Sequence, residues 1–131
     1  MANPKRAARQ PRNSGIYAEY AAVWYLRLRG YRIVGRNTRT PFGEIDIIAA
    51  KRDVIAFVEV RYRSAVDFGT PLETVTRKKQ DRIIKSARYC MLGWGYPCLQ
   101  IRFDVLGIRR RGWFFAVEHI ANAFGEENEF V

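Results

Sequence analysis

The spacing of hydrophobic and polar residues divides this chain into two helical segments and several short extended ones. From Ser14 to Arg29 apolar residues recur every three or four positions, which is the period of a helix. Those residues are Tyr17, Ala21, Trp24, Tyr25 and Leu28. Gly30 follows directly, at a position where helices commonly stop. The pattern predicts a helix over 14–29 with these residues on its apolar side.

A second helix is predicted from Thr74 to Leu92, because its apolar and basic residues separate onto two faces. The apolar face carries Ile83, Ile84, Ala87 and Met91, and the basic face carries Arg77, Lys78, Arg82, Lys85 and Arg88. Short apolar runs bounded by turn residues predict strands over 31–36, 44–50, 54–61, 98–106 and 113–117. The order α-β-β-β-α-β-β predicts an α/β fold with helices packed on a mixed sheet.

The length of 131 residues is that of one domain. We expect a single domain over 14–131 and a flexible basic arm over 1–13. No stretch approaches the roughly 18 apolar residues of a spanning helix, and the first residues lack the apolar core of a secretory signal. Cys90, Cys98 and the only histidine, His119, cannot complete a structural zinc site. These features favour a reduced, cytoplasmic setting.

The charge of the chain is its most unusual bulk property. Lys and Arg total 23 against 13 acidic residues, so the formal net charge is +10. A field of this sign attracts polyanions and gains affinity by releasing their counterions. Nucleic acid is the commonest such partner and an anionic membrane surface the second. We expect nucleic acid and no membrane.

Two neighbouring predicted strands carry a pair of acidic residues among apolar ones. If the turn between these strands is centred between Arg52 and Asp53, Asp46 lies opposite Glu59, and Glu44 lies opposite Arg61. Two facing carboxylates repel each other and call for a cation. Mg²⁺ suits this place because it prefers hard oxygen ligands, and the carbonyl of Val60 would add another. The competing interpretation is a solvated charged face of the sheet.

Several short motifs, taken together, resemble a known family. They are Gly43-Glu-Ile-Asp-Ile-Ile48, Phe57-Val-Glu-Val-Arg-Tyr-Arg63, Lys79-Gln80, Arg102-Phe-Asp-Val105 and Asn122-Ala-Phe124. They resemble the YraN family of predicted endonucleases over nearly the whole chain, from about Gly15 to Phe124. The resemblance implies a restriction-endonuclease-like fold with the PD-(D/E)xK site of Holliday-junction resolvases.

The resemblance also implies roles for individual residues. Asp46 matches the metal-binding Asp and Glu59 the second acid, with Mg²⁺ or Mn²⁺ as the cofactor. Glu19 matches the acid of the first helix and Gln80 the polar residue of the second, whereas Glu44 is expected to support the catalytic Asp. The chain departs from the pattern at one position, because Arg61 stands where the family has Lys. An arginine keeps the charge but is effectively never deprotonated.

The missing ammonium group has two candidate sources in this sequence, Lys78 and Lys79 of the second helix. Arg61 itself would offset charge at the reacting phosphate or pair with Glu44. DNA contacts are expected from the basic face of the second helix, the turn at 109–111, Arg63 and the N-terminal arm. The residues concerned are Arg63, Lys78, Lys79, Arg82, Arg109, Arg110 and Arg111. Trp94, Tyr96, Trp113 and Phe114 are expected to pack in the core or at an edge.

The leading hypothesis is a metal-dependent endonuclease acting on DNA, with branched or damaged DNA among the candidate substrates and DNA favoured over RNA. The alternative is a non-catalytic nucleic-acid-binding module that retains the nuclease fold, and its main support is Arg61. A third hypothesis is an adaptor that docks on a larger nucleic-acid machine. A homodimer would allow two strands to be cut symmetrically, although no residue marks an interface.

Overall fold

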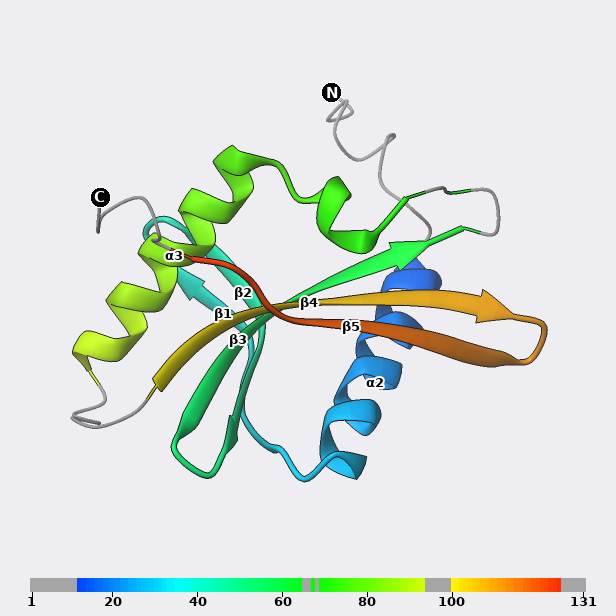
Figure 1. The fold of residues 1–131 in the computed structure, drawn as a ribbon, viewed down its shortest axis with the longest axis horizontal. Coiled ribbons are helices and arrows are strands. Elements are labelled where there is room, and N and C mark those ends of the chain that lie inside the picture. Colours follow the sequence, from blue (N-terminus) through cyan, green and yellow to red (C-terminus); the bar gives the residue numbers. More distant parts are fainter. Residues whose placement is uncertain (1–11, 65–66, 68, 94–99, 126–131) are drawn as a thin grey trace.

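The computed structural model describes residues 12–64, 67, 69–93 and 100–125. Two helices, a 3₁₀ turn and five strands follow one another along these residues (Figure 1). They are α2 (Arg12–Leu28), β1 (Arg32–Thr40), β2 (Gly43–Lys51), β3 (Val54–Arg63), η1 (Pro71–Thr74), α3 (Arg77–Leu92), β4 (Gln100–Arg111) and β5 (Phe114–Phe124). The predicted order α-β-β-β-α-β-β is therefore confirmed. The segment 1–11, most of the expected basic arm, lies outside the described residues.

The five strands form one sheet in the order β1-β2-β3-β4-β5. The pair β3 and β4 is parallel, and the other neighbouring pairs are antiparallel, so the sheet is mixed as predicted. Parallel neighbours need a crossover connection, and η1 and α3 provide it between β3 and β4. This connection brings α3 back across the sheet, where it packs mainly over β2 and β1.

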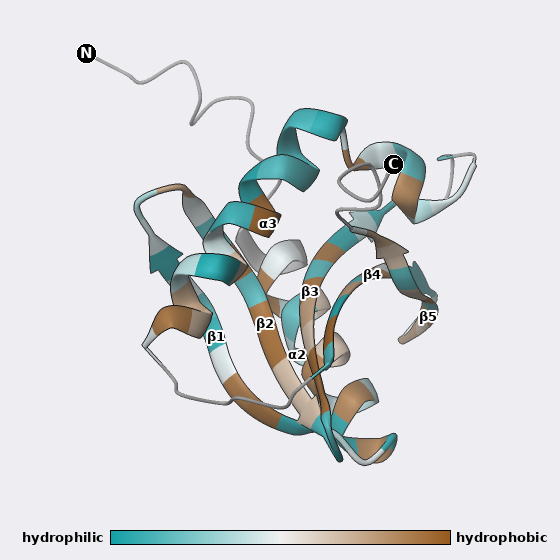
Figure 2. Ribbon diagram, turned by 60° about the vertical axis from the view of Figure 1, so that its left-hand side comes forward, coloured by the Kyte–Doolittle hydropathy of each residue, from teal (hydrophilic) through white to brown (hydrophobic). Residues whose placement is uncertain are grey.

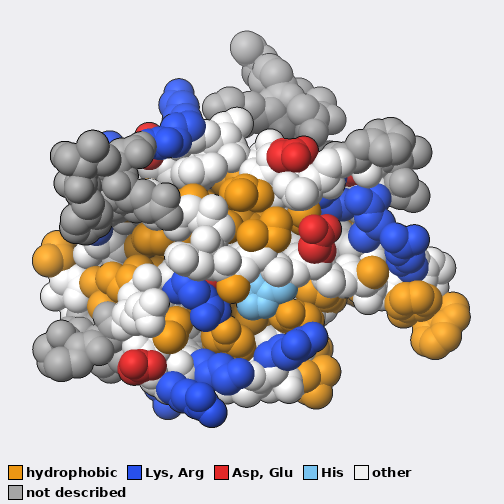
Figure 3. Space-filling model, in the orientation of Figure 1, with side chains coloured by type: hydrophobic (Ala, Val, Ile, Leu, Met, Phe, Trp, Pro, Cys, Tyr) orange, Lys and Arg blue, Asp and Glu red, His pale blue; other side chains and the backbone are white. Residues whose placement is uncertain are grey.

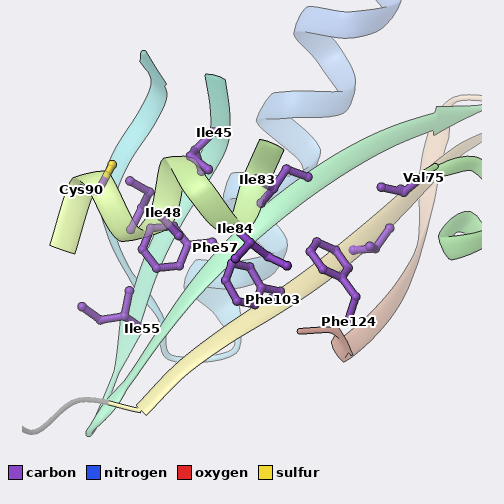
Figure 4. Packing of buried hydrophobic residues seen from close by; sticks show 12 residues of the cluster. Ile45, Ile48, Ile55, Phe57, Val75, Ile83, Ile84, Cys90, Phe103 and Phe124 are labelled. Carbon is purple, nitrogen blue, oxygen red and sulfur yellow. The ribbon is translucent and has the colours of Figure 1, made fainter. Parts of the chain in front are cut away.

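The two helices cover opposite faces of the sheet, and each face has its own hydrophobic core. On one face Ile83 and Ile84 of α3 pack over Phe57 and Phe103 (Figure 4). On the other face α2 packs against strand residues that include Ile47, Val58, Leu106 and Ile108. The central strands therefore bury apolar residues on both sides. Figure 2 shows hydrophobic residues in brown along much of β2 and parts of β3.

Helix α2 packs through a different side from the one that its large apolar residues predicted. The residues buried against the sheet are Ala18, Ala22, Val23 and Leu26. Tyr17, Trp24 and Leu28 are exposed. Small side chains let a helix backbone approach the sheet closely, so this narrow face and not the bulky one enters the core. The helix ends as expected, because Gly30 adopts a φ of 91° that favours glycine.

Helix α3 and the strands differ from the expectation only in their ends. Helix α3 begins at Arg77 instead of Thr74, because the Thr76 side chain accepts a hydrogen bond from the backbone N–H of Lys79 and so caps the helix. Ile83, Ile84 and Ala87 are buried, as predicted.

No helix within the described residues is long and apolar enough to cross a membrane.

Candidate metal and nuclease site

Asp46 of β2 and Glu59 of β3 lie just beyond the point where these two strands stop pairing. The ladder runs from Lys51–Val54 at the turn to Ile47–Val58, which is the register expected from a turn centred between Arg52 and Asp53. Asp46 would form the next pair, but its carboxylate instead accepts a hydrogen bond of 2.8 Å from the backbone N–H of Val60. The Asp46 side chain therefore takes the place of a backbone partner where the strands separate.

A break in the alternation of β2 turns Asp46 toward α2. Ile45 belongs to the core under α3, whereas Ile47 belongs to the core under α2, although residues two apart in a regular strand share a face. The same place in β1 is irregular. Arg36 pairs with Ile47 and Thr38 with Ile45, and Asn37 between them has a φ of 49°. Asn tolerates this left-handed conformation better than most residues.

The irregular segment of β1 also fixes the acid of the first helix. Asn37 Nδ2 donates to Glu19 Oε1 at 2.8 Å, and Arg36 Nη2 donates to the same oxygen at 3.0 Å. Glu19 and Asp46 line one surface opening, together with Gly15, Ile16, Ala18, Val60 and Tyr62. The predicted helix-one acid thus lies next to the predicted metal-binding acid, at the start of α2.

Glu59 is almost fully buried, with 4% of its side chain exposed, and two cations contact it. Arg61 Nη1 lies 3.5 Å and Lys79 Nζ 3.7 Å from Glu59 Oε2. Arg61 Nε also donates to Thr74 Oγ1 at 3.0 Å, which ties the arginine to η1. Of the two lysines proposed as the source of the ammonium group, Lys79 contacts Glu59, whereas Lys78 is exposed. We call Asp46 and Glu59 the acid pair.

The carboxyl groups of Asp46 and Glu59 are close enough to share a hydrogen bond. Burial raises the pKa of Asp46 well above its usual value, and the charge and hydrogen bond of Glu59 raise it further. The hydrogen bond from Val60 and the charge of Lys79 oppose this rise without cancelling it. Ionisation of Asp46 beside Glu59 is therefore disfavoured, and a cation near both carboxyl groups would favour it.

One further prediction about the acids differs from the structure. Glu44 does not face Arg61, because β2 and β3 have already separated there. Its ion pair is with Arg39 of β1, with 3.8 Å between Oε2 and Nε. Gln80 Nε2 donates to the carbonyl of Val75 at 3.1 Å and so anchors the start of α3. The role of Gln80 in the site stays a prediction.

The predicted nucleic-acid contacts divide into exposed and enclosed residues. Lys78, Arg82, Arg110 and Arg111 are exposed. Arg63 is not available as expected, because 3% of it is exposed and its guanidinium donates to the carbonyl of Gly69. Arg109 is half-buried and donates to the carbonyls of Ser64 and Asp67. In Figure 3, Lys and Arg side chains lie beside apolar ones at the right-hand end, over the turn between β4 and β5.

The aromatic residues of that turn are not packed, contrary to the prediction. Trp113 is 91% exposed, and Phe114 is also exposed and contacts it edge to face. Trp94 and Tyr96 lie outside the described residues. A short turn at the tip of a two-stranded extension offers nothing to pack against, which sequence periodicity does not reveal.

A buried polar network that includes a residue of α2 was not predicted from the sequence. Asp104 is fully buried, and both its oxygens accept hydrogen bonds of 2.8 Å from Arg102. His119 Nε2 lies 2.8 Å from Asp104 Oδ2, and its Nδ1 lies 3.1 Å from the hydroxyl of Tyr25. The network joins α2, β4 and β5 and gives His119 a structural role. The signal was an acid and an arginine alternating with apolar residues on one strand.

The acid pair is a small site by the standards of protein metal centres. Within the described ranges, no three His, Cys, Asp or Glu side chains gather in a way that could hold an ion. Asp46, Glu59 and the carbonyl of Val60 would leave several positions to water and substrate. That donor set suits Mg²⁺ or Mn²⁺, because Mg²⁺ is commonly held by one or two carboxylates together with waters and phosphate oxygens.

The helices on both faces of a mixed five-stranded sheet define an α/β protein that is consistent with a restriction-endonuclease-like fold. The profile of the uncharacterised protein family UPF0102 matches residues 18–108. The chain is 42% identical to a UPF0102 protein of Syntrophotalea carbinolica, over 84% of this chain and 89% of that relative. It is 44% identical to one of Persephonella marina, over 84% and 91% respectively. A UPF0102 protein of Myxococcus xanthus is 37% identical over 92% of this chain and 95% of its own length.

This chain belongs to UPF0102, and the resemblance to the YraN family is thereby confirmed.

Proposed function

We propose that this protein is a metal-dependent endonuclease that hydrolyses phosphodiester bonds of DNA at the site of Asp46 and Glu59. The observation that carries the proposal is the contact of these two carboxyl groups, one of them with a raised pKa, beside two cationic side chains. Raised acid pKa values of this kind gather at functional sites. A purely structural acid pair would more simply be replaced by apolar residues in so apolar a sheet.

Asp46, Glu59 and the carbonyl of Val60 are the groups proposed to hold Mg²⁺ or Mn²⁺. The fit rests on the donor set, since the neighbouring carboxyl groups of Asp46 and Glu59 offer the hard oxygens that a divalent cation prefers, and Asp46 must be ionised to bind it. Such an ion would polarise a phosphoryl oxygen and lower the pKa of an attacking water. Val60 has two roles in this proposal. Its carbonyl would bind the ion, and its N–H already donates to the Asp46 carboxylate.

Lys79 and Arg61 are proposed to stabilise negative charge that develops on the scissile phosphate. Lys79 brings from α3 the ammonium group that the family pattern places two residues after the second acid. Arg61 supports the same carboxylate from its own strand and is held by Thr74. Glu19, fixed by Arg36 and Asn37, is proposed to orient water or substrate at the opening next to Asp46.

The phosphate backbone is proposed to follow the exposed cations of α3 and of the turn between β4 and β5. Lys78 and Arg82 lie on the outer face of α3, and Arg110 and Arg111 on that turn. Contacts of this type fix the position of a duplex and read little sequence. Binding should therefore weaken steeply as salt rises, with a slope that reports the number of phosphates contacted.

The proposal is tested by incubating the purified protein with nicked, branched and single-stranded DNA in the presence of Mn²⁺. We expect cleavage that EDTA stops and that Asp46→Ala abolishes while DNA binding persists. Asp81→Ala, which removes an exposed acid paired with Arg77, is the matched control and should retain cleavage. Cleavage that persists equally in Asp46→Ala would place the activity elsewhere or in a contaminant.

A second candidate function is a nucleic-acid-binding module without turnover. Glu59 favours it, because Arg61 and Lys79 already offset its charge and leave less need for a metal ion. This function predicts salt-sensitive DNA binding that does not respond to metal, and no cleavage by either the natural protein or Arg61→Lys. Cleavage in Arg61→Lys alone would indicate an intact site that lacks only the lysine.

A further inference from the structure

Helix α2 presents a row of exposed aromatic side chains on the side that faces away from the sheet. Tyr17, Tyr20 and Trp24 are 57%, 50% and 59% exposed. They are spaced by three and four residues, so they lie one above another on one face of the helix. We call these three residues the aromatic stripe. At about 1.5 Å per residue the stripe spans about 10 Å.

Arginine side chains lie against the rings of the stripe. The guanidinium carbon of Arg36 lies 5.3 Å from the centre of the Tyr20 ring, and that of Arg27 lies 5.7 Å from the Trp24 ring. Between Gly15 and Thr40 the sequence has five Arg and one acid, Glu19. Arg27 and Arg36 therefore place positive charge beside the stripe. Two copies of such a face would repel each other, whereas a polyanion would be attracted.

The stripe adjoins the proposed catalytic opening through a shared arginine. Arg36 contacts the Tyr20 ring and at the same time donates two hydrogen bonds to Glu19, which lines the opening with Asp46. Ile16, another lining residue, lies one helical turn before Tyr20. A strand whose phosphate entered the opening would have its neighbouring nucleotides over the first turns of α2.

We infer that the aromatic stripe stacks the unpaired bases of a nucleic-acid strand next to the proposed cleavage site, so that the substrate class is DNA with a single-stranded segment. This inference rests on the proposed action on DNA. Exposed aromatic rings flanked by cations form the usual platform for single strands, because every base has a face that can stack. The bases of an uninterrupted duplex are already stacked and paired, and they cannot reach such a platform. About 10 Å accommodates roughly three nucleotides at a rise of about 3.4 Å.

The test measures binding without cleavage. The full chain in EDTA is titrated into a fluorescein-labelled single strand of mixed sequence and into a blunt duplex of the same sequence, and anisotropy gives both dissociation constants. The double variant Tyr20→Ala/Trp24→Ala should weaken single-strand binding at least about tenfold, because each stacked base contributes substantially. Duplex affinity should change less than about twofold.

Two matched variants separate stacking from other causes. Tyr20→Phe/Trp24→Phe keeps the rings and should restore single-strand binding to within a few-fold. Leu28→Ala removes an exposed apolar side chain without an aromatic ring from the same helix. Single-strand binding should not change in this variant. Thermal melting of each variant checks that the fold is intact.

The outcomes distinguish this inference from the proposed function. Unchanged single-strand affinity in the double alanine variant, or equal losses on single strand and duplex, would overturn the inference even if the protein cuts DNA. It would also be overturned if the double variant lost only binding to phosphatidylserine vesicles, or only a self-association visible by light scattering. A selective loss on the single strand would uphold it even in a protein with no cleavage activity.

Discussion

The ammonium group of Lys79 lies 3.7 Å from the carboxylate of Glu59, although the two residues belong to different elements and stand 20 positions apart in the chain. Helix α3 makes this contact possible, because the crossover between β3 and β4 brings its first turn, which carries Lys79, to the side chain of Glu59. Arg61 occupies the position two residues after Glu59 and contacts the same carboxylate oxygen. An acid, an arginine and a lysine are thus brought together from two elements, and in the proposed function Lys79 takes the place of the lysine of the (D/E)xK pattern.

Lys79→Ala should lower the rate of DNA cleavage about a hundredfold, because a single positioned donor to developing negative charge contributes about that much. The rate is measured in single turnover with Mn²⁺ and saturating protein. Lys78→Ala, on the exposed neighbouring position, should change affinity and its salt dependence but leave the saturated rate within a few-fold. Equal effects of the two variants would remove Lys79 from the proposed mechanism.

Asp46→Asn should make the folded protein more stable above neutral pH. The pKa of Asp46 is raised in the folded state above its ordinary value of 3.8, so folding loses stability as pH rises through the interval between the two values. An amide keeps the acceptor for Val60 N–H, and it can donate to Glu59 without losing a proton. We expect a gain of about 1 kcal/mol or more at a pH of about 8, since each pKa unit corresponds to about 1.4 kcal/mol.

This gain should shrink as the pH falls toward 3.8, where Asp46 is protonated in both states. Urea denaturation at several pH values measures it, with Glu44→Gln as a control that should show no such gain. A variant that is less stable than the natural protein at a pH of about 8 would mean that Asp46 is a structural residue.

Asp104→Asn should destabilise the fold by roughly 3 kcal/mol, because it leaves the enclosed Arg102 without its anionic partner. Burial acts to raise the pKa of Asp104, but the hydrogen bonds from His119, Arg102 and Asn122 outweigh it and the pKa is lowered. The stabilising contribution of the carboxylate is therefore present above the ordinary value of 3.8 and is lost as pH falls through the lowered value.

The free energy of unfolding of Asp104→Asn should therefore approach that of the natural protein at acidic pH. Urea denaturation over a pH series measures this difference. Asp81→Asn, which removes an exposed partner of Arg77, should cost less than about 1 kcal/mol. A small effect of Asp104→Asn, similar to that of Asp81→Asn, would contradict the structural role of the network.

Much of the fold followed from local patterns, because hydrophobic periods and turn residues act over a few positions. The turn at Arg52 and Asp53 set the register of β2 and β3 correctly from Lys51–Val54 to Ile47–Val58. The separation of these strands beyond that pair could not be predicted, because the Asp46 carboxylate, and not a backbone group, accepts from Val60 N–H there. The pairing of β2 with β1 keeps its register across this point, from Arg36–Ile47 to Thr38–Ile45.

The orientation of α2 shows a different limit. Large apolar side chains marked one face, but the sheet accepts the face with Ala18 and Ala22, whose small side chains permit close packing. The pairing of Lys79 rather than Lys78 with the acids likewise depends on where α3 begins, and that is set by the cap at Thr76. Tertiary packing determines both the buried face of α2 and the lysine that contacts the acids. Residue spacing alone does not predict such packing.

Titration of Mn²⁺ into the purified protein by isothermal calorimetry, at pH values from about 6 to about 8, measures directly whether Asp46 and Glu59 hold a metal ion. Binding should strengthen with pH, because Asp46, whose pKa is raised, must lose its proton before its carboxylate can hold the ion. Asp46→Asn and Glu59→Gln should each weaken it at least about tenfold. Absence of binding by the natural protein, or equal binding by both variants, would contradict the claim that this acid pair holds the metal ion.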